Sequence, residues 1–318
     1  MNKKSFEEVY EDIQNNSNDV IEMAEAAKKE RRKQNLITLL LCIGIDAGII
    51  YYLTSKFEIG LESIPICIIG CAFVDLITFA IVALSLGKKQ KEFRKMYKEQ
   101  IIKKVIDNFY DNLEYFPERG IAQNIYNEGK YMEGYNRYFS DDYIEAKIDN
   151  KFLINLAEVC TQREETHTDS DGDTHTTTYT IFHGLFAKIV IEKSINTNLR
   201  ITPGTKISVY KERLEMDSSE FEKNFNVYTP NKITGMQILT ADIMEEILEF
   251  KNKTKNAFDI FIDQNIIYLR FSCGSMFEKT KIKNGKFDEK SLREYYNILD
   301  FIYELTNKII RIIDETDI

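Results

Sequence analysis

Two long apolar runs near the start dominate the hydrophobic pattern of the chain. Residues 36–53 are almost all Leu, Ile, Gly, Ala, Cys or Tyr, and a second such run covers 64–86. At a helical rise of ~1.5 Å per residue, both runs can cross a hydrocarbon core of ~30 Å, the first only just. A buried core helix normally keeps more polar residues than the single charged residue found in each run. The pattern therefore predicts two transmembrane helices joined by a short turn.

The pattern changes to that of soluble protein after the second run. Apolar residues at helical spacing predict a stalk helix over Glu92–Tyr115. Alternation over 143–148 and 152–159 predicts two strands joined by a turn at Asp149–Asn150. Later segments with strand or helix patterns are, in chain order, a long core strand over 178–192, strands at 226–228 and 238–239, a helix over 241–251, strands at 258–261 and 266–271, and a helix over 289–315.

These elements predict an α+β protein, in which a two-helix transmembrane hairpin precedes a cytoplasmic domain with a mainly antiparallel sheet and packed helices. We expect five parts: an N-terminal cytoplasmic helical segment (1–34), the transmembrane hairpin (35–87, with spans about 36–53 and 64–86), a basic stalk helix (88–114), the α+β domain (115–285) and a C-terminal helix (286–318).

Basic residues flank both apolar runs and set the expected orientation. They are Lys28, Lys29, Arg31, Arg32 and Lys33 before the first run, and Lys88, Lys89 and Lys91 after the second. The positive-inside rule then predicts a two-pass protein of the inner (plasma) membrane, with the N- and C-termini in the cytoplasm. The same side chains would lie against anionic inner-leaflet lipids, at about 1 kcal/mol per charge.

Composition excludes some partners and compartments. The net charge is −9, and the large domain shows no basic stripe with interleaved aromatic residues, so we expect no nucleic-acid binding. The five cysteines form no CxxC pair and their count is odd, which is typical of reduced thiols in a reducing compartment.

Asp46 and Asp75 are the two carboxyls inside the predicted spans, each about 11 residues from the cytoplasmic end of its run, and therefore at nearly one depth. Two nearby carboxyls at low dielectric cannot both ionise, so at least one is expected to be protonated. Three interpretations remain open. Each carboxyl bonds a neighbouring backbone carbonyl or Thr78, or the pair joins hairpins into an oligomer, or an oligomer uses the pair to handle protons or cations.

The most polar stretch of the chain, Thr161–Thr180, is nearly palindromic around Asp171-Gly172 and predicts a β-hairpin. Such a hairpin brings His167 near His175, with Asp169 and Asp173 alongside. Two imidazoles with carboxylates suit zinc or nickel, so these four residues are a candidate metal site. The alternative is a solvated hairpin tip that binds nothing.

Motifs of known catalytic chemistry are missing from the sequence. Glycine-rich phosphate loops, GxSxG, HExxH and a Walker lysine do not occur, and there are three histidines in all. We therefore expect no catalytic residues, no cofactor and no enzymatic activity.

Six short motifs occur in an order that resembles one bacterial family. They are Asp142-Tyr143-Ile144-Glu145 with Lys147-Ile148-Asp149, Ala157-Glu158-Val159, Ile181-Phe182-His183-Gly184-Leu185-Phe186, Ser219-Glu220-Phe221-Glu222-Lys223 with Val227-Tyr228, Ile238-Leu239-Thr240 with Met244, and Met276-Phe277-Glu278. The chain resembles the DUF3137 family of unknown function over roughly Tyr115–Glu278. The resemblance implies two membrane spans before a soluble α+β domain, and it brings no catalytic residues. Thr234-Gly235-Met236 departs from a charged run that is common in the family.

The sequence therefore predicts a membrane-anchored binding or scaffold module that contacts the lipid bilayer and a protein partner or further copies of itself. The alternatives are a metal-binding enzyme or sensor that uses the His/Asp hairpin tip, and an oligomer that handles protons or cations through the paired intramembrane aspartates.

Overall fold

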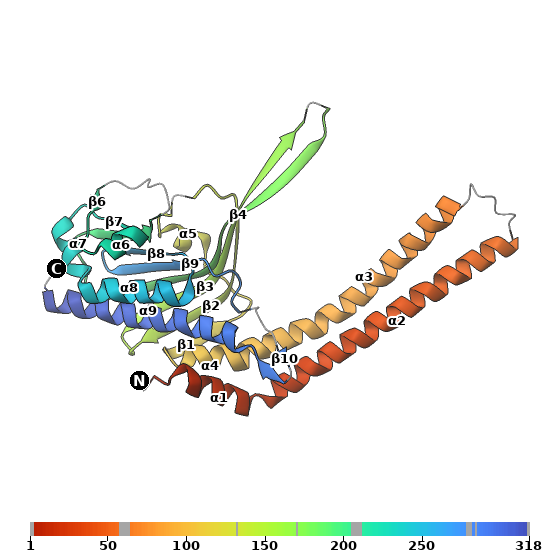
Figure 1. The fold of residues 1–318 in the computed structure, drawn as a ribbon, viewed down its shortest axis with the longest axis horizontal. Coiled ribbons are helices and arrows are strands. Elements are labelled where there is room, and N and C mark those ends of the chain that lie inside the picture. The colour runs from red at the N-terminus through yellow and green to blue at the C-terminus, as the bar shows by residue number, and fades with distance from the viewer. Residues whose placement is uncertain are drawn as a thin grey trace. The chain divides into compact units, whose positions relative to one another are not determined.

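The fold is known from a computed structural model, which describes residues 3–56, 64–131, 133–169, 171–204, 212–277, 282–283 and 285–316 (Figure 1). The chain forms two compact units. We call residues 14–100 with 281–287 the helical unit, and residues 1–13, 101–280 and 288–318 the sheet unit. The predicted turn between the two spans lies mostly outside the described residues.

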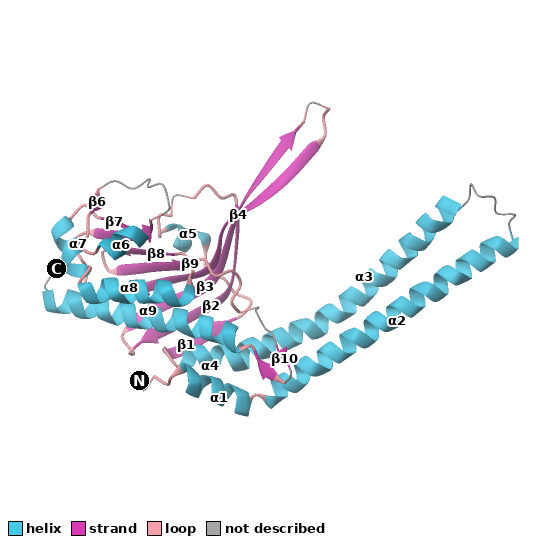
Figure 2. Cartoon of the chain, viewed as in Figure 1, coloured by secondary structure: helices cyan, strands magenta, loops and turns pink. Residues whose placement is uncertain are grey.

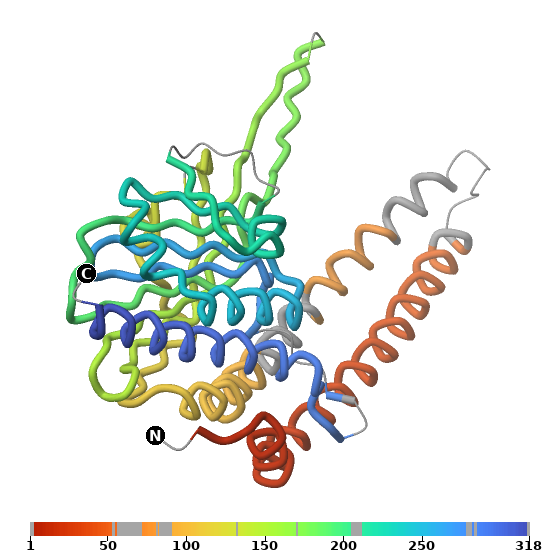
Figure 3. Tube along the Cα trace, turned by 60° about the vertical axis from the view of Figure 1, so that its left-hand side comes forward, coloured from red at the N-terminus to blue at the C-terminus, as the bar shows by residue number. Residues whose placement is uncertain are grey.

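The helical unit is built on two long helices, α2 (Asn18–Lys56) and α3 (Ile64–Tyr97), which contact each other (Figures 1 and 3). A small antiparallel hairpin of β10 (Ile282–Lys283) and β11 (Lys286–Phe287) belongs to the same unit. Its β10 strand lies against α2, and the Phe287 ring centroid lies 6.2 Å from that of Tyr97. This hairpin therefore packs with the helices although it follows the sheet strands in sequence.

Helix α2 exposes its apolar residues. The stretch Asn18–Tyr52 contains an 18-residue window of mean hydropathy 1.7, of which only 6% is buried. A core helix of a soluble protein is mostly buried, so α2 has the length, composition and exposure of a membrane-spanning helix. Among the described residues this is the one helix that meets that description. The second predicted span falls within α3, where the side chains of 64–71, 81 and 83–90 lie outside the described part.

Within the described residues, the sheet unit holds nine strands in the order β1-β2-β3-β4-β9-β8-β5-β7-β6, with antiparallel neighbours. Their bounds are β1 Asp111–Phe116, β2 Arg137–Ile148, β3 Phe152–Thr168, β4 Thr174–Val190, β5 Asn198–Pro203, β6 Arg213–Leu214, β7 Phe225–Tyr228, β8 Phe258–Asp263 and β9 Ile266–Phe271. Antiparallel strands with helices packed on them confirm the predicted α+β class.

Two long helices cover one face of the sheet, α8 (Ala241–Thr254) and α9 (Glu289–Thr316) (Figure 2). The rings of Phe250 on α8 and Phe301 on α9 stack at 4.0 Å, and Phe271 of β9 lies edge-on to both. The shorter helices are α1 Phe6–Asn16, α4 Lys103–Asp107, α5 Gln123–Asn127, α6 Ser219–Asn224 and α7 Lys232–Ile238, with a π-helical turn at Lys98–Ile102. The aromatic layer beneath α8 and α9 forms a hydrophobic core on this face of the sheet.

The opposite face carries buried charges. Arg200 donates to Asp259 at 2.7 Å and Arg270 donates to Glu133 at 2.5 Å, with both arginines almost fully buried. The Tyr131 ring lies between them, 5.5 Å from one guanidinium and 3.9 Å from the other. Glu133 and Tyr131 belong to the segment around α5 that covers this face. Removing one partner of such a pair would leave an uncompensated buried charge, so the segment and the sheet depend on each other.

Most predicted elements are confirmed, and two are wrong. The hairpin turn at Asp149–Asn150 has positive φ at both residues, as a type I′ turn requires. The stalk helix ends at Asp107 instead of Tyr115, because 111–116 pair with β2 as strand β1. The predicted strand at 238–239 is the end of helix α7, whose first turn is capped by the Asn231 side chain accepting from the Thr234 N–H.

Gly184 allows a close backbone approach, as a glycine within a strand often does. A Cβ at this position would lie 1.8 Å from the Phe271 carbonyl oxygen and 2.9 Å from the Cys273 nitrogen. We expect Gly184→Ala to lower the free energy of unfolding by about 2–3 kcal/mol. Thermal unfolding of the detergent-solubilised chain measures this. Gly204→Ala is the matched control, since its Cβ would meet the nearest atoms at 3.4 Å. Equal stability of the two variants would contradict the close approach.

Candidate functional site

A β-bulge in β2 creates the site. Asp141 pairs with Glu158 of β3, but the next pair is Ile144 with Leu156, so two residues of β2 face one residue of β3. Asp142, in the bulge, has φ +55°. Its N–H donates to the Pro117 carbonyl at 3.3 Å instead of to β3. The bulge therefore turns the Asp142 side chain toward its neighbours.

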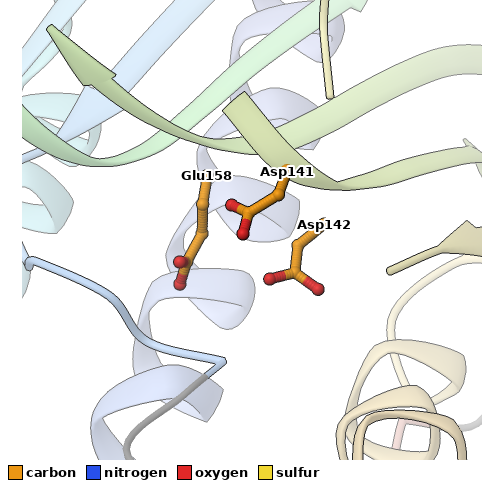
Figure 4. A group of neighbouring side chains, drawn as sticks. All are labelled: Asp141, Asp142 and Glu158. Atoms are coloured by element: carbon orange, nitrogen blue, oxygen red, sulfur yellow. The ribbon is translucent and has the colours of Figure 1, made fainter. Parts of the chain in front are cut away.

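Three carboxyls converge at the bulge (Figure 4). One oxygen each from Asp141, Asp142 and Glu158 lies within 4.8 Å of the others, and the Asp142 and Glu158 side chains are buried. The Tyr115 hydroxyl donates to Asp142 Oδ1 at 2.5 Å. Glu158 Oε1 accepts from the Phe277 N–H at 2.8 Å and also from the Met276 N–H. Carboxylate oxygens in this number suit a hard cation such as calcium or magnesium.

Burial controls the charge of this cluster. Burial is the largest cause that raises the pKa of Glu158, and the N–H donors of Phe277 and Met276 oppose it. The negative charges of Asp142 and Asp141 add to the rise, and the net pKa is about 8. Burial also raises the pKa of Tyr115, with the Asp142 carboxyl adding to the effect. Glu158 therefore holds its proton at neutral pH, and the cluster is less negative than its three carboxyls suggest.

A pocket of about 540 Å³ opens beside the cluster. It is lined by Tyr138, Phe139, Ser140, Asp141, Glu158, Val159, Cys160, His183 and Ser275. His183 Nε2 hydrogen bonds Ser275 Oγ at 3.0 Å, which is the first contact that a serine nucleophile needs. In the described part of the chain, the other ring nitrogen of His183 has no partner, so nothing orients the imidazole.

The predicted histidine pair faces across the ladder. His167 is the direct partner of His175 in the pairing of β3 with β4, as expected. Their side chains are 71% and 72% exposed. His175 Nε2 lies 3.5 Å from an Asp169 oxygen, and the Asp173 N–H donates to Asp169 Oδ1 at 2.9 Å. Among the described residues, the group of three closely spaced ligand atoms lies at the bulge, at Asp141, Asp142 and Glu158. Metal binding at the hairpin tip therefore stays a prediction.

The two carboxyls of the predicted spans, Asp46 and Asp75, lie on facing helices. The Cys42 thiol of α2 hydrogen bonds Asp75 of α3, and Asp46 is near enough to act on the same thiol electrostatically. Thr78 donates its hydroxyl to the Val74 carbonyl at 2.9 Å. Oδ1 of Asp46 and Oδ1 of Asp75 are buried without a hydrogen-bond partner among the described residues. The structure thus brings both carboxyls close to the Cys42 thiol, and each of the three interpretations of the pair stays a prediction.

The basic flank of α2 is exposed along its whole length, at Lys28, Lys29, Arg31, Arg32 and Lys33. Lys91 of α3 is also exposed, and the side chains of Lys88 and Lys89 lie outside the described residues. Their contact with lipid head groups stays a prediction.

Sequence analysis missed the carboxyl cluster. One signal was present, because Glu158 is the one charged residue in the mostly apolar strand 152–159. A charged residue at a core position of a strand indicates a partner or a shifted pKa. No such signal was present for Asp142. This residue lies near Glu158 only because of the bulge in β2, and the sequence pattern does not show the position of the bulge.

The raised pKa of Glu158 predicts how stability depends on pH. Between its ordinary pKa of 4.5 and about 8, the folded state binds more protons than the unfolded state, so stability falls as pH rises through that window. In Glu158→Gln the amide oxygen still accepts both N–H groups and cannot ionise. We expect this part of the pH dependence, on the order of 3–5 kcal/mol, to disappear.

Unfolding midpoints at about pH 5 and about pH 9 measure the effect. Glu114→Gln, at an exposed position of β1, is the control and should keep the slope of the unmodified chain. The same slope in Glu158→Gln would show that Glu158 is ionised in the folded protein at neutral pH.

Comparison with known proteins agrees with the resemblance seen in the sequence. Residues 180–310 match the family described as "Protein of unknown function (DUF3137)". No curated protein matches the chain. The crystal structure of the mycobacterial trehalose monomycolate transport factor A is similar over 62% of this chain and 88% of that chain, at 8% identity and a TM-score of 0.35. A TM-score this low establishes no shared fold. The family match runs from within β4 into α9, so this part of the chain is similar to the DUF3137 family.

Proposed function

We propose that the chain is a non-enzymatic, membrane-anchored module, whose sheet unit binds a protein or lipid partner at the cytoplasmic face of the plasma membrane. The observation that carries the proposal is the exposed apolar surface of α2. Leu36, Leu39, Leu40, Leu41 and Ile43 are each more than half exposed. At roughly 25 cal/mol per Å² of apolar surface, a helix of this kind is strongly unfavourable in water and favourable in hydrocarbon.

Charge supports the two-pass orientation. The exposed basic residues of α2 precede its apolar part, and Lys91 follows the apolar part of α3. In the proposed topology both flanks lie at the inner leaflet, where lysine and arginine are favoured. The sheet unit, which follows the second span in sequence, would then lie in the cytoplasm.

The pocket at the β-bulge supports binding over catalysis. It is open and bordered by Asp141, and among the described residues the second ring nitrogen of its histidine has no partner to orient it for acid–base work. A surface of negative potential attracts groups of positive potential. A basic group of the partner is therefore the chemistry that this pocket suits.

Membrane fractionation tests the anchor. We expect the unmodified chain to stay in the membrane pellet after an alkaline carbonate wash. Leu40→Asp combined with Leu76→Asp places one added carboxyl in each apolar run and should cost about 6 kcal/mol of insertion free energy, so this variant should leave the pellet.

The control for that experiment is Met23→Asp, which adds the same residue type to the polar part of α2 and should stay membrane-bound. An unmodified chain that remains in the supernatant without detergent would refute the anchor. Protease added outside intact spheroplasts tests orientation, because the sheet unit should resist digestion until the cells are lysed. Digestion from outside would refute the cytoplasmic placement and leave the anchor intact.

A further inference from the structure

The hairpin of β3 and β4 continues beyond the sheet as an isolated two-stranded ribbon (Figures 1 and 2). Its pairing is regular to the end, with Thr166 opposite Thr176, His167 opposite His175 and Thr168 opposite Thr174. The turn is closed by the Asp169 N–H, which donates to the Asp173 carbonyl at 2.9 Å. A regular ladder fixes which side chains share a face, because successive residues of a strand point to opposite sides.

The two faces of this ribbon differ in chemistry. One face carries only threonine near the tip, at 166, 168, 174 and 176, and the hydroxyl oxygens of Thr166 and Thr176 lie 3.4 Å apart. The other face carries both histidines, with Glu165 and Asp169 two residues before and after His167. A hairpin tip that only needed to be soluble would not require threonines on one face and histidines with carboxylates on the other. Because of this arrangement, both imidazoles of the ribbon lie on the same face.

The carboxylates already approach the imidazoles. His167 Nε2 lies 3.7 Å from Glu165 Oε2, and His175 Nε2 lies 3.5 Å from Asp169 Oδ2. Asp169 Oδ1 accepts the Asp171 and Asp173 N–H groups, which holds this carboxylate in place and leaves Oδ2 for a ligand. Directly opposed residues have Cβ atoms about 4.5–5.5 Å apart, so rotation of two exposed imidazoles is enough to bring both to one ion.

We propose that this face of the ribbon, which we call the histidine face, binds one divalent transition-metal ion such as zinc. His167 and His175 supply two imidazole nitrogens, and Asp169 and Glu165 supply carboxylate oxygens, the mixed donor set that zinc takes in proteins. Two neutral imidazoles and two carboxylates also balance the 2+ charge. Glu165 replaces Asp173 in the set expected from the sequence, because Glu165 is the carboxylate beside His167.

Such an ion would link the two strands at the end where the sheet no longer supports them. A two-stranded ribbon alone is marginally stable in water. Ligation of one residue from each strand closes the ladder near its turn and reduces its opening. Binding and ribbon order are therefore coupled, which gives two independent measurements of one site.

Zinc titration of the full-length, detergent-solubilised chain tests the proposal, with the metal removed beforehand by a chelator and without a histidine-containing affinity tag. We expect one zinc ion per chain by calorimetry. His167→Ala and His175→Ala should each weaken binding at least ~10-fold. Binding should also weaken as pH falls, because ligating imidazoles must lose their protons. Zinc should slow amide hydrogen exchange at 166–168 and 174–176.

Thr166→Ala with Thr176→Ala is the matched control, because it alters the opposite face of the same ladder and should leave zinc affinity unchanged. Magnesium should not slow exchange in the ribbon, since it prefers oxygen ligands. Stoichiometric zinc binding that persists in both histidine variants would place the ion elsewhere, for example at Asp141, Asp142 and Glu158, and would overturn the proposal. Absence of saturable zinc binding by the unmodified chain would overturn it as well.

Discussion

The register of one strand, β3, determines the position of both candidate sites in this protein. On one side β3 pairs with β2, which sets Glu158 opposite Asp141 just before the bulge. On the other side it pairs with β4, which sets Cys160 opposite His183 at the pocket and His167 opposite His175 in the ribbon. A shift of one residue would move every side chain of β3 to the other face of the sheet. Glu158 would then leave the bulge, and the histidines would no longer share a face with their carboxylates.

The buried ionisable groups on the two faces of the sheet are stabilised in different ways. Under the α5 segment, charges are paired, as Arg200 is with Asp259 and Arg270 with Glu133. Near the bulge, Glu158 has backbone N–H donors and carboxyl neighbours, and it remains neutral by keeping a proton. Paired charges hold a covering segment in place at all ordinary pH values. A buried protonated carboxyl is different, because it responds to pH and to any cation that approaches it.

Local patterns were sufficient to predict most of the elements. Alternation identified β2 and β3, short apolar runs identified β8 and β9, and the Asp149-Asn150 pair identified a turn. The palindrome around Asp171-Gly172 identified the ribbon and its histidine register. Each of these depends on residues close in sequence. The start of β1 was missed because apolar spacing in 92–115 fits a helix, and only pairing with β2 makes 111–116 a strand. The carboxyl cluster was missed because it joins residues from different strands through a bulge whose position the sequence does not reveal.

The small hairpin at 281–287 has a practical consequence for any attempt to study the sheet unit alone. It belongs to the helical unit, where Phe287 contacts Tyr97 and the β10 strand lies against α2. The polypeptide therefore enters the helical unit twice, once through α2 and α3 and once on the way from β9 to α9. A truncated chain that starts after Gln100 would keep Phe287 and lose the aromatic ring beside it. If residues 101–318 were expressed alone, the apolar side chain of Phe287 would be exposed to water just before α9. Replacing Phe287 with a polar residue would avoid this exposure.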